Sequence, residues 1–280
     1  MKARSCFVFA VVGAAHVETA SVALRFLKRF TRRNIVVVQA RSERRASHDQ
    51  VIEAELPEEL DDHQASIFLK TDLLSYVKGS AERFCYLDSD VIAAGEGVDA
   101  IFDYRAGAVT FAPDHADVDA FSRWAVQCGC RDLCPHLREA LARTFGIDIA
   151  RPDWRLWNGG VFLFDGESEE FLAAWHGMSC EVMDDPYWRT RDQGTLAGAA
   201  WKFGLQDQPV LPQRFNFIVD CMRGVSPQAR PALKPEQSFV RTDYVLGAPG
   251  APQLLHFING GVGRRGWSNW DDAEALLAVS

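Results

Sequence analysis

The sequence predicts an α/β fold: a mixed, mainly parallel sheet flanked by helices. The apolar run Phe7–Val12 is typical of a buried strand. Thr19–Phe30 follows with apolar residues at near-helical spacing, and Ile35–Val38 then supplies a second strand. Because the connection between the two strands is long enough for a helix, we expect parallel neighbours.

Later segments extend the same architecture. The charged stretch 41–62 is expected to be surface helix or loop, and prolines mark the last third as rich in loops. The other expected elements are helices at Ser66–Val77, Phe171–Met183 and Gln193–Trp201, and strands at Phe84–Leu87, Ala108–Phe111 and Gly160–Phe164.

The chain length fits one large domain. Its 280 residues are within the range that a single α/β core can organise, and no linker divides them. We therefore expect a single domain over residues 1–280. The polar, partly helical segment 114–154 is expected to be an insertion or an acceptor-side segment.

Composition excludes several classes of protein. With 48% hydrophobic and 24% charged residues the chain is globular, and its net charge of −8 argues against a general nucleic-acid partner. Seven unevenly spaced cysteines indicate a reducing compartment, so we expect a cytoplasmic protein. Lys2 and Arg4 before an apolar run resemble the start of a secretory signal, but the same run fits a buried strand. No apolar stretch approaches the roughly 20 residues of a membrane span, so any membrane contact is expected to be peripheral.

The strongest local signal is the acidic motif Asp88-Ser89-Asp90, which follows the apolar residues of a strand. Ligands of open α/β sheets gather beyond the carboxyl ends of strands. Paired carboxylates there can hold a divalent cation that also grips phosphate oxygens. A solvated turn is the alternative, but unpaired burial of two charges would be costly, which favours a metal site.

Three further motifs carry polar groups next to expected strands or helices. Asn158-Gly159-Gly160 precedes a strand; its glycines suggest close approach of backbone to ligand, and the Asn158 amide can hold a sugar hydroxyl. An ordinary turn would explain this motif equally well. Asp192 and Gln193 begin a helix, where Asp192 is a plausible cap. In the alternative interpretation, the side chains of Asp192 and Gln193 face the reacting carbon of a sugar.

The last motif joins His256, at the end of an apolar run, to a glycine-rich loop containing Gly261, Arg264 and Arg265. An imidazole can complete a metal shell begun by carboxylates, while glycine N–H groups and arginine can hold phosphate. A core histidine is the commoner explanation of such a residue. The basic loop beside it favours the ligand interpretation.

A separate group of possible metal ligands, Cys128, Cys130, Cys134 and His136, lies within nine residues and could hold zinc. Its spacing lacks the paired Cys-x-x-Cys knuckles of common zinc sites. The sequence therefore favours small buried side chains in the 114–154 segment.

The order of these motifs resembles the retaining glycosyltransferases of family 8, which include glycogenin and bacterial lipopolysaccharide galactosyltransferases. The likeness spans roughly Phe7 to Trp267, although only short motifs match. It implies the GT-A nucleotide-diphospho-sugar transferase fold, a UDP-sugar donor, Mn²⁺ or Mg²⁺, and transfer of a hexose-type sugar with retention. The acceptor hydroxyl would belong to a carbohydrate, a lipid-linked molecule or a protein, as in bacterial polysaccharide or lipopolysaccharide biosynthesis.

The resemblance also implies roles for individual residues. Asp88, Asp90 and His256 would bind the metal, and Gln193 would lie nearest the reacting face as an electrostatic and positioning group. Where the family has lysine and proline before a tryptophan, this chain has a longer loop, so either arginine there can meet the diphosphate. Other implied contacts are those of Ala10, Val11, Lys70, Ser89 and Gly160 with the donor, of Asn158 and Asp192 with its sugar, and of Gly261, Arg264 and Arg265 with its phosphates; Asn216 matches a family Tyr-Asn pair.

Two other functions remain open. A nucleotidyltransferase acting on a sugar phosphate also uses a sheet, a metal and carboxylates, but usually has a basic glycine-rich loop after its first strand, which Gly13-Ala14-Ala15-His16 is not. A non-catalytic nucleotide-sugar binding module is the other alternative. The intact set of Asp88, Asp90, Asp192, Gln193 and His256 argues against it.

Overall fold

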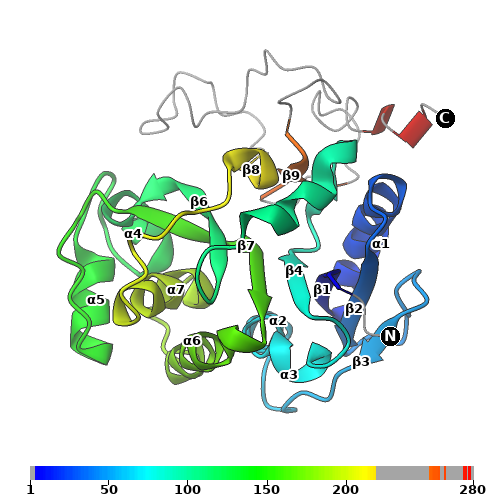
Figure 1. Cartoon of the computed structure of the whole chain (residues 1–280). Helices are drawn as coiled ribbons and strands as arrows, with labels where there is room; N and C mark the ends of the chain where they lie inside the picture. The colour runs from blue at the N-terminus through cyan, green and yellow to red at the C-terminus, as the bar shows by residue number, and fades with distance from the viewer. Residues whose placement is uncertain (1–3, 219–251, 259–261, 263–273, 276, 279–280) are drawn as a thin grey trace.

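A mixed six-stranded sheet runs through the middle of the protein. The computed structural model describes residues 4–218, 252–258, 262, 274–275 and 277–278 (Figure 1). The sheet order is β3-β2-β1-β4-β7-β6; β1 to β4 are mutually parallel, and β7 is antiparallel to both its neighbours. The strands are β1 (Cys6–Val12), β2 (Asn34–Ala40), β3 (Val51–Glu53), β4 (Arg83–Leu87), β6 (Thr110–Asp117) and β7 (Arg155–Asp165).

Both faces of the sheet are covered, because alternate residues of its strands point to opposite sides. In β1, Phe7 and Phe9 face α1 (Gly13–Phe30) and the 3₁₀ helix η1 (Glu96–Tyr104). Val8, on the opposite face, belongs to a core that also contains residues of several other helices. Among them are α2 (Asp62–Thr71), α3 (Leu73–Val77), α6 (Glu169–Glu181) and α7 (Arg191–Lys202). The mainly parallel α/β fold predicted from the sequence is confirmed.

The segment 114–154 begins inside β6 and leads to β7. It contains α4 (Val118–Ala125) and α5 (His136–Phe145), which pack on each other and on α7. These two helices lie on the side of the molecule away from α1 (Figure 1). The 3₁₀ turn η2 (Gly166–Ser168) then connects β7 to α6.

A second, three-stranded sheet lies beside the main one. It has the order β5-β9-β8, where β5 is Val91–Ala93, β9 is Leu254–His256 and β8 is Phe217–Ile218. Strand β9 is antiparallel to β5 and parallel to β8, and η3 (Gln213–Phe215) precedes β8. This sheet attaches a late part of the chain to the residues that directly follow β4.

Several element bounds differ from those the sequence predicted. The helix expected at Ser66–Val77 is two helices, divided at Asp72, and the stretch 41–62 contains the short edge strand β3. The strand expected at Gly160–Phe164 already begins at Arg155. Thus the Asn158-Gly159-Gly160 motif lies within a strand, because pairing with β6 and β4 holds it there.

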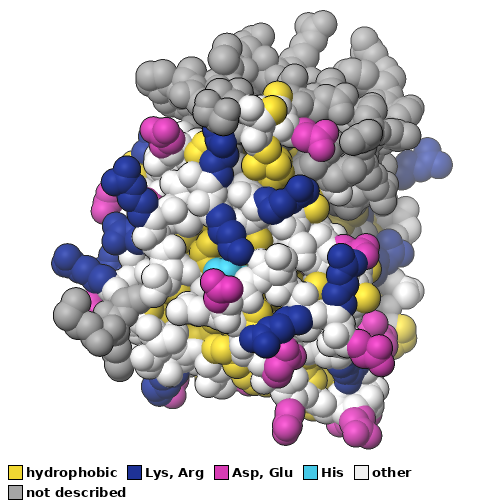
Figure 2. Space-filling model, turned by 90° about the vertical axis from the view of Figure 1, so that its right-hand side faces the viewer, with side chains coloured by type: hydrophobic (Ala, Val, Ile, Leu, Met, Phe, Trp, Pro, Cys, Tyr) yellow, Lys and Arg dark blue, Asp and Glu magenta, His cyan; other side chains and the backbone are white. Residues whose placement is uncertain are grey.

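Three further observations concern membrane-crossing helices, cysteines and surface charge. None of the helices among the described residues has the combined length and apolar character needed to cross a membrane. The six cysteines of the described part are free thiols. On the face shown in Figure 2, basic and acidic side chains are interspersed.

Phe111 provides a test of the aromatic core between β6, β7 and α6. Its ring stacks on Trp157 and Phe162 and is fully buried. We expect Phe111→Ala to lower the free energy of unfolding by about 3–5 kcal/mol, because it leaves a cavity. Urea unfolding would measure this, and Val210→Ala, at a 38% exposed position, should change it little. Equal losses in the two variants would contradict the packing described.

Candidate functional site

The Asp88-Ser89-Asp90 motif, called the acidic turn from here on, lies at the point where the strand order of the sheet reverses. From β1 the chain builds β2 and β3 on one side, then returns to place β4 on the other side. Such a switch point leaves a crevice at the carboxyl ends of the strands. Asp88 directly follows β4 and its N–H donates to the Gly160 carbonyl (2.9 Å), while the Val91 N–H donates to the Asp88 carbonyl (3.0 Å). The backbone thus fixes both carboxylates at this edge.

His256 reaches the acidic turn through strand pairing. In the small sheet Val91 is opposite His256, and the Phe257 N–H donates to the Asp90 carbonyl (3.0 Å). The His256 Nε2 atom lies 3.3 Å from Asp90 Oδ1 and 3.9 Å from Asp88 Oδ2. One ligand atom from each of the three residues lies within 4.8 Å of the others. They form a compact set of two carboxylates and one imidazole.

A chain of buried amides orients the imidazole. Asn158 Nδ2 donates to the Asp114 carboxylate (2.8 Å), so its Oδ1 faces away and accepts from Asn216 Nδ2 (2.9 Å). Asn216 Oδ1 is then turned to His256 Nδ1, 2.9 Å away. Since an amide oxygen only accepts, Nδ1 carries the proton. The carboxylate of Asp114 therefore determines every orientation in this chain.

The amide chain leaves the Nε2 lone pair of His256 directed at Asp88 and Asp90. A metal-binding histidine is oriented in this way, with its other nitrogen donating to an oxygen. Burial lowers the pKa of His256, but Asp90 and Asp88 outweigh burial and raise the pKa above its usual value. When no cation is bound, the raised pKa favours a proton on Nε2, and a divalent cation would replace that proton.

Lys70 links the acidic turn to α7. Its Nζ lies 3.3 Å from Asp88 Oδ1 and 3.0 Å from Asp192 Oδ2, and the side chain is buried. Burial lowers the pKa of Lys70, but the two carboxylates more than compensate and raise it, so the ammonium stays charged. Burial raises the pKa of Asp192, but the effect of Lys70 is larger and in the opposite direction, so the pKa of Asp192 is lowered overall.

The charges of this group do not cancel. Asp88, Asp90 and Asp192 bring three negative charges and Lys70 one positive charge, so with a neutral His256 two negative charges remain. Uncompensated charges in a partly buried place are costly. A divalent cation at the Asp88, Asp90 and His256 set would neutralise them, so these residues fit Mn²⁺ or Mg²⁺.

The adjacent glycines of β7 make room for the site. Along β6 the partner changes from Phe162 at Phe111 to Asn158 at Ala112, so Gly159 and Gly160 lie in a bulge. A Cβ atom on Gly160 would come within 2.3 Å of the His256 ring. Only glycine permits this approach.

Gln193 and Asp192 lie in the first turn of α7, with Thr190 as the residue before the helix. Of the two interpretations that the sequence left open for Asp192, the helix cap does not apply: Thr190 holds the cap position, and the Asp192 carboxylate pairs with Lys70. The Gln193 side chain accepts from the Gly159 N–H (2.9 Å) and donates to the Trp157 carbonyl. Gln193 therefore clamps the bulge of β7 to α7.

The other expected site residues are placed less directly. Ser89 is half-buried between the two aspartates, and Ala10 is half-buried near the end of β1. The Val11 side chain is fully buried in the core against α1, so its expected contact with a nucleotide is not available to the side chain. Gly261, Arg264 and Arg265 lie outside the described residues.

Sequence reasoning missed Asp114, which is buried and also lies 2.8 Å from His115 Nδ1. Its only signal in the sequence was a carboxylate just beyond an apolar strand. Asn216 was noted through the resemblance alone, and its partners are far away in the chain. Tyr86 was read as part of a strand, yet its hydroxyl donates to Asp88 Oδ1.

Comparison with known proteins supports the fold from structure alone. No family model matches the sequence, and no curated protein matches it. Solved glycosyltransferase structures do match, so the chain has the GT-A fold.

Three solved structures illustrate the likeness. The bifunctional glycosyltransferase WbbM superposes with a TM-score of 0.66 at 13% identity, covering 100% of this chain and 50% of WbbM; this chain thus spans half of WbbM's length. The galactosyltransferase LgtC, solved with donor and acceptor sugar analogues, gives 0.56 at 16% identity over 98% of this chain and 95% of LgtC. GlyE of Streptococcus pneumoniae TIGR4 gives 0.56 at 15% identity, covering 98% of this chain and 62% of GlyE.

Gly160→Ala tests the close approach of β7 to His256. The added methyl group should displace the imidazole, and we expect Mn²⁺ binding to weaken at least about tenfold, as when the support of a metal ligand is lost. Calorimetric titration with Mn²⁺ would measure this. Gly177→Ala is the matched control, because a Cβ there meets no atom within 4 Å. Unchanged Mn²⁺ affinity in Gly160→Ala would refute the arrangement.

Lys70→Met tests the charge balance. Removing the ammonium leaves Asp88 and Asp192 facing each other, so we expect about 2–4 kcal/mol lower unfolding free energy at pH 7. The pKa of Asp192 should rise without Lys70, so the folded variant then binds the proton more tightly than the unfolded chain. The loss should consequently shrink as the pH falls from 7 toward 5.

Lys78→Met is the control for this change, since Lys78 pairs with Glu169 at the exposed surface. It should lose less than about 1 kcal/mol. A Lys70→Met loss as small as that, or one independent of pH, would contradict the buried ion pairs.

Proposed function

We propose that this protein is a metal-dependent glycosyltransferase that moves a hexose-type sugar from a UDP-sugar to an acceptor hydroxyl with retention of configuration. The observation that carries the proposal is the convergence of Asp88, Asp90 and His256 at the switch point of a GT-A fold. The excess of negative charge there suits a divalent cation together with a diphosphate.

Mn²⁺ or Mg²⁺ would be held by these three side chains, whose carboxylate and imidazole ligands suit a cation of this kind. When bound, such a cation supplies positive charge to the departing diphosphate. Our proposal keeps Arg264, Arg265 and Gly261 as diphosphate contacts, and Ser89, Ala10 and the Val11 backbone as donor contacts.

The remaining groups act by position and charge. Lys70 lowers the pKa of Asp192 and holds its side chain toward the acidic turn. The Asp192 carboxylate can there accept hydrogen bonds from sugar hydroxyls. Both polar ends of the Gln193 amide hold the backbone of β7, which suits a positioning group better than a nucleophile. Asn158 Oδ1 accepts from the Gly160 N–H and Asn216. One of the two N–H groups of its amide donates to Asp114, and the other would be available to substrate.

Retention fits a dissociative path. As the bond from the sugar to the diphosphate breaks, the anomeric carbon gains oxocarbenium character, and the acceptor hydroxyl attacks from the face that the diphosphate leaves. A donor phosphate oxygen takes the hydroxyl proton. The nearby carboxylates, held in place by Lys70 and the strand backbone, stabilise this positive charge without moving.

A screen of UDP-sugars with and without Mn²⁺ tests the function. We expect release of UDP from one sugar class only with the metal, and Asp90→Asn should reduce release at least about 100-fold. Glu82→Gln, an acidic-to-amide change at an exposed position, is the control. NMR of the product would show the anomeric configuration, and inversion would contradict the retaining mechanism.

The same assay separates the two alternatives. Pyrophosphate release from a nucleoside triphosphate and a sugar phosphate would favour a nucleotidyltransferase. Tight binding of UDP-sugars with no UDP release, in the presence of varied acceptors, would favour a binding module.

A further inference from the structure

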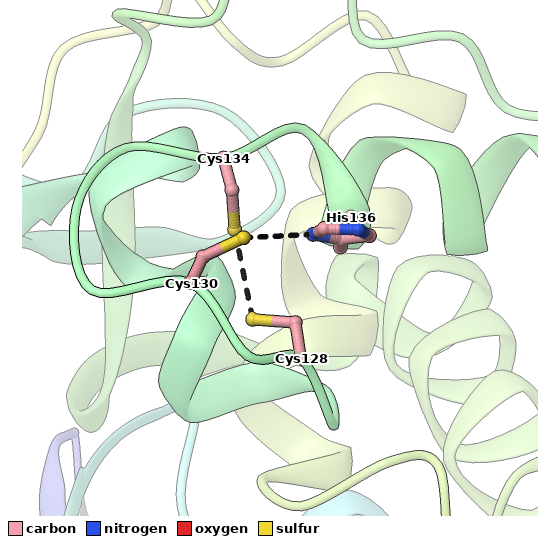
Figure 3. A group of neighbouring side chains, drawn as sticks. All are labelled: Cys128, Cys130, Cys134 and His136. Atoms are coloured by element: carbon pink, nitrogen blue, oxygen red, sulfur yellow. Dashed lines mark hydrogen bonds between the residues drawn. The ribbon is translucent and has the colours of Figure 1, made fainter.

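A second group of metal-binding side chains lies between α4 and α5, away from the acidic turn. Cys128, Cys130 and Cys134 occupy the connection between these helices, and His136 begins α5. Their side chains converge on one point in Figure 3. One ligand atom from each of the four lies within 4.8 Å of the others.

The distances within this group match a tetrahedral metal shell. Cys128 Sγ lies 3.7 Å from Cys134 Sγ, and Cys130 Sγ lies 3.7 Å from His136 Nδ1. In tetrahedral zinc sites, Zn–S bonds of about 2.3 Å and Zn–N bonds of about 2.1 Å put two thiolates about 3.8 Å apart and a thiolate and a nitrogen about 3.6 Å apart. A disulfide would require about 2.05 Å. All three cysteines are free thiols.

We propose that Cys128, Cys130, Cys134 and His136 form a structural zinc site. Three thiolates and one imidazole are a common closed ligand set for zinc, with no position left open for a substrate. The sequence favoured small buried side chains here because the spacing Cys-x-Cys-x₃-Cys-x-His lacks a standard knuckle. The fold overrides that expectation, since Cys130 and His136, six residues apart, face each other across the loop.

The surroundings hold the loop in place for such a site. The Cys134 N–H donates to the Asp119 carbonyl (3.2 Å) at the start of α4, and the Leu137 N–H donates to Ser122 Oγ (2.7 Å). Arg138 also forms a bidentate ion pair with the Asp119 carboxylate. The ligands are thus carried by backbone that is already anchored to both helices, which favours a preformed site.

The same loop supports the entry to α7. The Gln127 N–H donates to the Tyr187 carbonyl (2.7 Å), and the Arg189 N–H donates to the Ala125 carbonyl (2.8 Å). The chain from Tyr187 to Arg189 leads directly into the helix that carries Asp192 and Gln193. Zinc at this site would therefore stabilise the segment that positions the first turn of α7.

Metal analysis of the untagged full chain, expressed with zinc in the medium, tests the proposal. We expect about one tightly held zinc per chain after dialysis, and Cys128→Ser should lose most of it. Cys180→Ser is the matched control, as Cys180 is also a half-buried free thiol but lies on α6. Wild-type protein without retained zinc, or Cys128→Ser with full zinc content, would overturn the proposal.

Cobalt substitution identifies the ligands independently of any variant. Co²⁺ in the wild-type chain should give the thiolate charge-transfer and tetrahedral ligand-field bands of a sulfur-rich site, and these should persist in Asp90→Asn. A spectrum without thiolate bands would place the metal at the acidic turn and overturn the proposal. Removing the metal should lower the thermal unfolding midpoint by about 5 °C or more; an unchanged midpoint would contradict a structural role.

Discussion

The need to hold three carboxylates together at one edge of a sheet governs the arrangement of this protein. Asp88 and Asp90 follow β4, and Asp192 approaches from α7. Lys70 stands between Asp88 and Asp192 and forms an ion pair with each of them. The remaining negative charge draws in the imidazole of His256 and fits a divalent cation.

His256 can serve this site only because the hydrogen bond from its Nδ1 to Asn216 fixes its tautomer. The hydrogen-bond chain from Asp114 through Asn158 and Asn216 runs in one direction, because it begins at a group that can only accept. The four residues come from four separate parts of the chain. The hydrogen bonds that link these four residues offset the cost of burying them and also give the site a single arrangement.

The segment 114–154 connects the proposed zinc group with the candidate site. Its first residue is Asp114, the end of the amide chain, and the loop between its two helices, together with the first residue of α5, carries the cysteine and histidine group that we assign to zinc. The loop between the helices also holds the chain that enters α7. The segment expected to be an insertion is thus connected to the candidate site through Asp114 and, by way of α7, through the loop between its two helices.

The sequence by itself determined the local pieces: the buried strand before Asp88, the strand-helix-strand unit, and the residue types suited to a cation. These depend on hydrophobic periodicity and short motifs, which neighbouring residues carry. Only the tertiary structure decided that His256 pairs with Val91, that Asp192 binds Lys70 and does not cap its helix, and that Cys130 faces His136. Pairings of this kind depend on strand register and on contacts between distant segments, and no local pattern encodes these.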